Sequence, residues 1–99
     1  MELEKRKELY EKAIRVWGVE AQRNMAFEEL GELNTALARD RRGRATKEEI
    51  LTELADVTIM CEQMALILGY EDYEKMLDDK LIRLRDDKLA KYETKEAEN

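Results

Sequence analysis

Apolar residues recur along this chain at the three- and four-residue intervals of amphipathic helices, and no segment alternates in the manner of a half-buried strand. Residues 3–17 and 19–41 each carry one such stripe, and Gly18 lies between them as a break. The apolar positions of these two stripes are Leu3, Tyr10, Ala13, Ile14 and Trp17, then Ala26, Leu30, Leu33 and Leu37. The pattern predicts two helices separated at the glycine.

Polar and basic residues interrupt the pattern at 39–46, which predicts a loop around Gly43. Thr46 and Glu49 then have the spacing of a capping box, in which the threonine caps the helix and the glutamate reaches back to it. A third helix is expected from this cap to Leu68, where Gly69 follows as a C-terminal glycine.

A fourth helix is expected from about Asp72 to Tyr92, followed by a frayed polar tail over residues 93–99. Residues 1–92 show no internal repeat and no composition shift, which predicts a single helical domain. The expected fold class is therefore all-α, with four helices in one protomer.

The third helix is apolar around most of its circumference from Leu54 to Leu68. A helix of this kind has to be covered on most sides. Three short helices of one chain provide little cover, so the pattern favours a dimer whose interface includes this helix. A central helix in a compact monomer is the alternative.

Composition narrows the function classes. The 99 residues carry a net charge of −6, with 42% charged and 43% hydrophobic residues, which fits a folded protein and argues against binding a nucleic-acid polymer. The single cysteine, Cys61, excludes an intrachain disulfide and fits a reducing compartment. No segment resembles a signal peptide or a membrane span, so a cytoplasmic location is expected without membrane contact.

Two groups of carboxylates border the apolar stripes of neighbouring helices. Glu29 and Glu32 are three residues apart on the second helix, with Glu28 beside them, and Glu53 and Asp56 are three apart on the third. Residues at this spacing share a helix face. If the two helices pack antiparallel through their apolar stripes, Glu29, Glu32, Glu53 and Asp56 converge.

Convergent carboxylates are unfavourable unless a cation or protons neutralise them. The chain has no histidine, and its donors here are oxygens, which favours Mg²⁺, with Mn²⁺ as a second possibility. Because Mg²⁺ commonly bridges to substrate phosphates, phosphate chemistry is the expected purpose of such a site. Acidic pairs are also common on solvated helix faces, which is the alternative for each pair taken alone.

The pattern E-E-x-x-E over 28–32 followed by E-x-x-D over 53–56 resembles the signature of the MazG-like all-α nucleoside triphosphate pyrophosphohydrolases. The resemblance extends from about Trp17 to Arg85 and is strongest to the short, single-domain members of phages and bacteria. It implies cleavage of the α–β phosphoanhydride of a nucleoside triphosphate, giving a nucleoside monophosphate and pyrophosphate. It also implies a homodimer or a tetramer, located in the host cytoplasm if a phage encodes the chain.

Transferred to this sequence, the resemblance makes Glu29, Glu32, Glu53 and Asp56 the metal ligands, and Glu28 a further ligand or a group that positions water. Without histidine, a carboxylate has to accept the proton of the attacking water, and Glu28 and Glu32 are both candidates.

Binding of phosphate and base requires further groups. Lys80 and Arg83 share a face of the fourth helix and are candidate phosphate ligands, although ordinary ion pairs on a solvated face would also explain them. Trp17 could stack on a base, or simply pack in the core, and Gln22 could hydrogen-bond a base or sugar. The loop arginines could reach phosphate, although solvating the loop is their more ordinary role: Arg39, Arg41, Arg42 and Arg44.

Two other function classes compete with the hydrolase. A non-catalytic helical dimer that regulates a protein partner would use the acids as a solvated or docking surface. A redox-active carboxylate bundle is a poor fit because the chain has no E-x-x-H pair.

Overall fold

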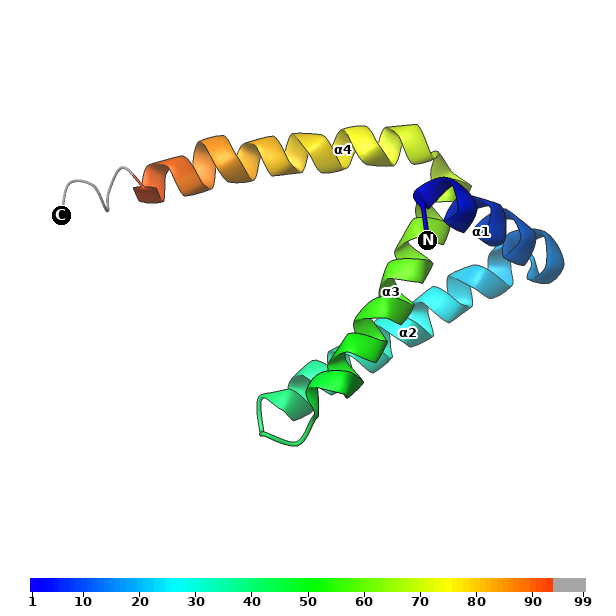
Figure 1. Cartoon of the computed structure of the whole chain (residues 1–99), viewed down its shortest axis with the longest axis horizontal. Helices are drawn as coiled ribbons and strands as arrows, with labels where there is room; N and C mark the ends of the chain where they lie inside the picture. The colour runs from blue at the N-terminus through cyan, green and yellow to red at the C-terminus, as the bar shows by residue number, and fades with distance from the viewer. Residues whose placement is uncertain (94–99) are drawn as a thin grey trace. The chain divides into compact units, whose positions relative to one another are not determined.

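The computed structural model describes residues 1–93, and within them every secondary-structure element is helical (Figure 1). This confirms the all-α prediction. The elements are α1 (Leu3–Trp17), α2 (Val19–Asp40), α3 (Lys47–Leu68), α4 (Tyr70–Arg83) and the π-helix η1 (Leu84–Leu89). The predicted tail over 93–99 falls almost entirely outside the described residues.

The chain divides into two compact units, Met1–Leu68 and a second unit that begins at Gly69. The first contains α1, α2 and α3, and the second contains α4 and η1. The first unit carries both acidic pairs. The predicted single domain over 1–92 stays a prediction.

Local sequence signals determine where the helices end. Gly18 adopts φ 91°, a conformation that favours glycine, and its N–H donates to the Ile14 carbonyl oxygen at 2.8 Å, closing α1 before α2 begins. The predicted capping box is confirmed, because Glu49 N–H donates to Thr46 Oγ1 at 3.1 Å and Thr46 N–H donates to Glu49 Oε2 at 3.3 Å. The cap starts α3 directly after the loop.

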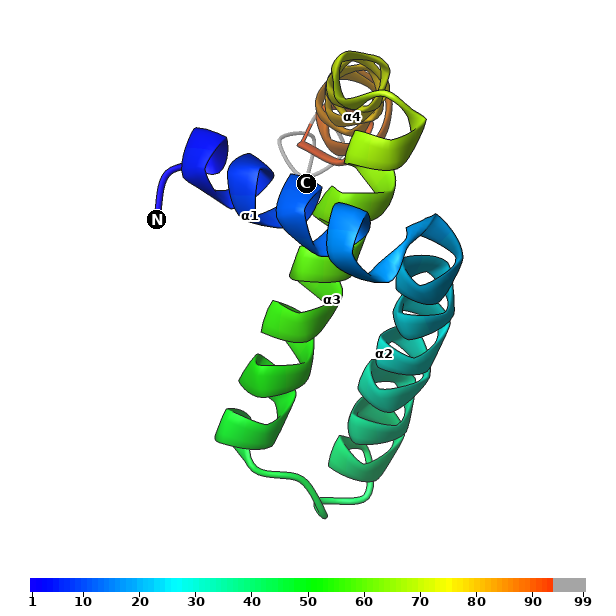
Figure 2. The ribbon, with the colours of Figure 1, turned by 90° about the vertical axis from the view of Figure 1, so that its right-hand side faces the viewer.

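Helices α2 and α3 form an antiparallel hairpin and lie side by side in both views of the ribbon (Figures 1 and 2). Helix α1 crosses the hairpin at the end away from its loop and packs against both helices (Figure 2). The buried apolar side chains of this unit are Tyr10, Ala26, Met60 and Ala65. So small a core is typical of a chain that relies on further contacts for stability.

A polar contact anchors α1 to α3. Arg6 donates to Glu62 through Nε at 3.0 Å and through Nη2 at 2.9 Å, and the buried Tyr10 hydroxyl donates to Glu62 Oε1 at 2.5 Å. The Arg6 hydrogen bond lowers the pKa of the Glu62 carboxyl, against the opposing effect of burial. Burial and the Glu62 contact raise the pKa of Tyr10 to about 12. Glu62 thus accepts three hydrogen bonds from two residues of the neighbouring helix.

One face of α3 is left uncovered by α1 and α2. Leu51, Leu54 and Ile59 are all more than two-fifths exposed, and Cys61 is exposed as well. Leu51, Leu54 and Cys61 are three and seven residues apart, so they share one face of α3, and Ile59 lies on a neighbouring sector of the helix. The predicted all-round apolar helix therefore has a real apolar surface that the first unit does not bury.

The second unit begins at Gly69, whose φ of 125° favours glycine. Helix α4 starts at Tyr70, two residues before the predicted start, and α-helical geometry gives way to the π-helix after Arg83. The rings of Tyr70 and Tyr73 pack edge to face with centroids 5.5 Å apart. No helix within residues 1–93 combines the length and the apolar character needed to span a bilayer.

Candidate metal centre

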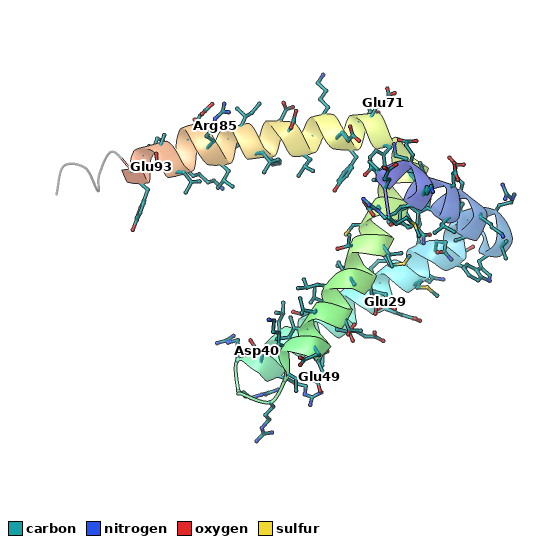
Figure 3. All side chains as sticks on the ribbon, viewed as in Figure 1. Glu29, Asp40, Glu49, Glu71, Arg85 and Glu93 are labelled. Carbon is teal, nitrogen blue, oxygen red and sulfur yellow. The ribbon has the colours of Figure 1, made fainter. Side chains whose placement is uncertain are left out.

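Three carboxylates from the two helices of the hairpin meet at its seam. Glu29 of α2 and both Glu53 and Asp56 of α3 each offer an oxygen atom, and these atoms all lie within 4.8 Å of one another. Figure 3 places Glu29 part of the way along the hairpin, with Glu49 nearer the loop. The convergence expected from the sequence is therefore present for these three acids.

The helical repeat explains why the acids meet. At about 100° per residue, Glu53 and Asp56 lie within one sector of α3. Ala26 and Leu33 lie on the face of α2 that packs toward α3, and Glu29 lies on the same face between them. Because the two helices are antiparallel, the acidic positions fall at the same level of the hairpin.

Two oxygens of this cluster lack protein partners. Glu29 Oε2 and Glu53 Oε2 are buried and accept no hydrogen bond from any residue of the described chain. A buried carboxylate oxygen without a donor is unfavourable, and native proteins rarely leave one unsatisfied. These atoms need a cation, a proton or water.

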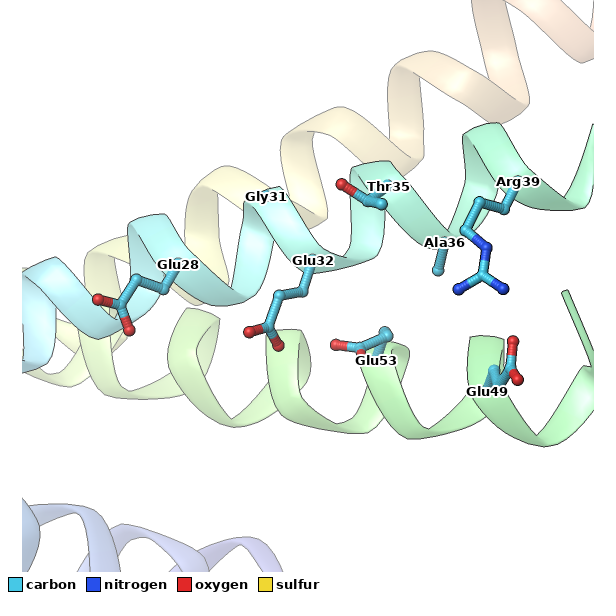
Figure 4. Close-up of a pocket in the computed structure, with 8 residues that line it drawn as sticks. All are labelled: Glu28, Gly31, Glu32, Thr35, Ala36, Arg39, Glu49 and Glu53. Carbon is cyan, nitrogen blue, oxygen red and sulfur yellow. The ribbon is translucent and has the colours of Figure 1, made fainter.

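The raised pKa values of two of these acids also indicate that their negative charges lack neutralising partners. Burial first, and then the charges of Glu32 and Asp56, raise the pKa of the Glu29 carboxyl. Burial, followed by the same two neighbours, also raises the pKa of Glu53. Glu32 acts on both carboxyls and lines a groove together with Glu53 (Figure 4), but it is not one of the three acids whose oxygens converge within 4.8 Å. The ionised carboxylates repel one another, and a bound divalent cation would relieve that repulsion.

An open groove of about 540 Å³ lies along the seam beside this cluster, and Glu53 is the one acid of the three that lines it. Figure 4 shows Glu28, Glu32 and Arg39 on α2, facing Glu53 and Glu49 of α3. The remaining lining residues are Gly31, Thr35 and Ala36. An added Cβ at Gly31 would meet nothing within 4 Å, so the glycine leaves open space at the wall of the groove.

The other predicted residues are placed differently. Trp17 is 64% exposed at the end of α1, so its expected core packing is wrong for this unit. Gln22 is 1% exposed, and essentially none of its surface is open to a base or sugar in this conformation. Lys80 and Arg83 both lie in the last turn of α4, in the second unit, and their contact with phosphate stays a prediction.

Sequence reasoning missed Thr35 as a lining residue of the groove. The signal was available, because Glu28, Glu32, Thr35 and Arg39 follow the four-, three- and four-residue intervals of one helix face. Arg39 belongs to this face of α2, whereas the loop arginines with which it was grouped follow the end of the helix at Asp40: Arg41, Arg42 and Arg44.

Comparison with known proteins gave no match. No family model fits the chain, and no curated protein and no solved structure is significantly similar to it. Any function is therefore inferred from the residues and their geometry.

Proposed function

We propose that this chain is a Mg²⁺-dependent nucleotide pyrophosphohydrolase that cleaves the α–β phosphoanhydride of nucleoside or deoxynucleoside triphosphates. The products would be a nucleoside monophosphate and pyrophosphate. The observation that supports this most is the meeting of Glu29, Glu53 and Asp56 within 4.8 Å, with two buried oxygens left without donors. The type of reaction, cleavage of the α–β phosphoanhydride, is what the motif resemblance in the sequence implies.

The residues present fit a hard divalent cation. All donors are carboxylate oxygens, as Mg²⁺ and Mn²⁺ prefer, and a cation would satisfy the orphaned Glu29 and Glu53 oxygens. Glu29, Glu53 and Asp56 would hold the ion, with Glu32 beside them. When bound, the metal supplies charge neutralisation on phosphate oxygens and lowers the pKa of a bound water.

The remaining acids of the groove can act as the general base that accepts the proton of the attacking water. Glu28 and Glu32 line the groove next to Glu53, so either carboxylate can accept a proton from a water molecule there. The groove has the volume of an ordinary small-molecule site, for which about 300–1,000 Å³ is typical. It accommodates the phosphate chain of a nucleotide along the hairpin seam.

The test is pyrophosphate release from a panel of nucleoside and deoxynucleoside triphosphates, with Mg²⁺ and with a chelator. We expect release that depends on Mg²⁺ for at least one member of the panel. Release of orthophosphate in place of pyrophosphate would contradict the proposed bond, and no release from any nucleotide would reject the activity.

We further propose that two copies of the chain associate through the uncovered apolar face of α3. The 99-residue chain is expected to sediment at twice its mass, because the exposed Leu51 and Leu54 would otherwise remain in water. Leu54→Arg should shift the protein toward monomer, whereas Leu9→Arg, at an exposed leucine of α1, should not. A stable wild-type monomer at micromolar concentration would contradict the dimer.

The same apolar face is the observation that favours the second candidate, a non-catalytic helical protein that regulates a partner. That function needs the exposed face of α3 but no metal in the groove. Absence of nucleotide hydrolysis together with no effect of Mg²⁺ on stability would select it over the hydrolase.

A further inference from the structure

The groove beside the acidic cluster has a basic end. Arg39 is the only cation among its lining residues, and it stands opposite Glu49, the lining acid of α3 nearest the loop (Figure 4). Glu28, Glu32 and Glu53 occupy the rest of its length. A groove that is acidic along one part and basic at one end suits a ligand that brings both a metal ion and anionic groups.

Arg39 is not engaged by the acids around it. Its side chain makes no salt bridge with any acid of residues 1–93, and the one hydrogen bond of its guanidinium within those residues runs from Nη2 to the Arg44 carbonyl oxygen at 3.1 Å. Glu49, the nearest lining acid along the groove, accepts a hydrogen bond from the Thr46 N–H as part of the helix cap. The remaining guanidinium N–H groups are available to a ligand.

The helix ends do not supply this charge. The C-terminus of α2 and the N-terminus of α3 lie at the same end of the hairpin, and their dipoles oppose each other. The surrounding segment, residues 39–49, has five basic and three acidic side chains in a chain whose net charge is −6. The excess positive charge of this segment therefore comes from side chains, and Arg39 is the basic one that lines the groove.

We propose that Arg39 binds the terminal phosphates of the substrate, so that the phosphate chain runs from the acidic cluster toward the loop. Seven residues separate Glu32 from Arg39, a rise of about 10 Å along α2 that a polyphosphate and an arginine side chain together span. Thr35 lies between them on the same wall and offers a hydroxyl to the chain. The leaving pyrophosphate departs at the Arg39 end, and the nucleoside lies toward Glu28.

This assignment rests on the proposed function, and it makes Arg39 a specificity residue for triphosphates over diphosphates. A guanidinium beside the outgoing pyrophosphate stabilises the charge that develops on it. A nucleoside diphosphate places one phosphate fewer at this end of the groove. Loss of Arg39 should therefore lower kcat/KM for a nucleoside triphosphate more than for a nucleoside diphosphate.

The kinetic test compares Arg39→Gln with Arg42→Gln, which makes the same charge change in the loop at a residue that does not line the groove. For a triphosphate, we expect kcat/KM to fall about a hundredfold in Arg39→Gln. Arg42→Gln should stay within about twofold, because an exposed charge is screened by salt. Arg39→Lys should recover part of the loss, since it restores the charge without the planar fork. Equal kcat/KM in Arg39→Gln and wild type would overturn the assignment while leaving the hydrolase intact.

A binding measurement separates this inference from the proposed function. Titration calorimetry of the full chain with inorganic pyrophosphate in the presence of Mg²⁺ should show about tenfold weaker binding for Arg39→Gln and no change for Arg42→Gln. If the wild type hydrolyses no nucleotide but binds pyrophosphate through Arg39, the proposed function fails and the phosphate subsite stands. Absence of pyrophosphate binding, or binding that is unaffected by Arg39→Gln, would overturn the subsite.

Discussion

Replacing Glu53 with glutamine is expected to abolish most of the hydrolysis without weakening the metal-free fold. Burial and the neighbouring acids raise the pKa of Glu53, so its charged form is disfavoured in the folded protein. Glutamine keeps nearly the same volume and removes one of the repelling charges. We expect pyrophosphate release to fall about a hundredfold or more, the scale on which losing one charge-stabilising group acts. The melting temperature without metal should equal or exceed that of the wild type.

The effect of Mg²⁺ on stability provides the control. A ligand that binds only the folded state at about 100 times its Kd adds about 2.7 kcal/mol of stability. Glu53→Gln should lose most of this gain, whereas Glu48→Gln, an exposed acid of α3 outside the cluster, should keep it. An equal loss in both variants would mean that diffuse surface charge binds the ion. A Glu53→Gln protein that melts much lower and still hydrolyses nucleotide would assign Glu53 to the scaffold.

The helix limits of the first unit could be read closely from the sequence because local signals set them. Gly18 separates α1 from α2, and the capping box of Thr46 and Glu49 begins α3 as predicted. The acidic cluster was equally predictable, since the spacing of Glu29, Glu53 and Asp56 requires only an antiparallel hairpin to bring the acids together.

Positions that depend on tertiary packing were less predictable. Trp17 and Gln22 have the residue types of a base pocket, yet Trp17 is exposed and Gln22 is buried, because exposure depends on tertiary packing and not on residue type. The groove wall at Thr35 and Arg39 depends on which side of the α2–α3 seam stays open. The π-helical turn after Arg83 had no signal in the apolar pattern.

The contact that holds α1 in place was also not anticipated, and its removal has the second large effect that we expect. Glu62→Ala should destabilise the fold by about 2–3 kcal/mol, because it leaves the buried Tyr10 hydroxyl without its acceptor and Arg6 without its partner. In a small domain this is a substantial share of the total stability. Thermal or urea unfolding of the full chain, compared with Glu11→Ala at an exposed acid of α1, measures the difference.

The pH dependence identifies the mechanism of that loss. The Arg6 hydrogen bond lowers the pKa of Glu62 below its ordinary value of 4.5, so the stability it contributes is present above that pH and disappears as the pH falls through the lowered pKa. Below that range the wild type and Glu62→Ala should therefore differ less than at pH 7. The exposed Glu11→Ala variant should parallel the wild type at every pH. A Glu62→Ala deficit that is the same at pH 7 and at pH 3 would show that packing, and not the charged contact with Arg6, anchors α1 to α3.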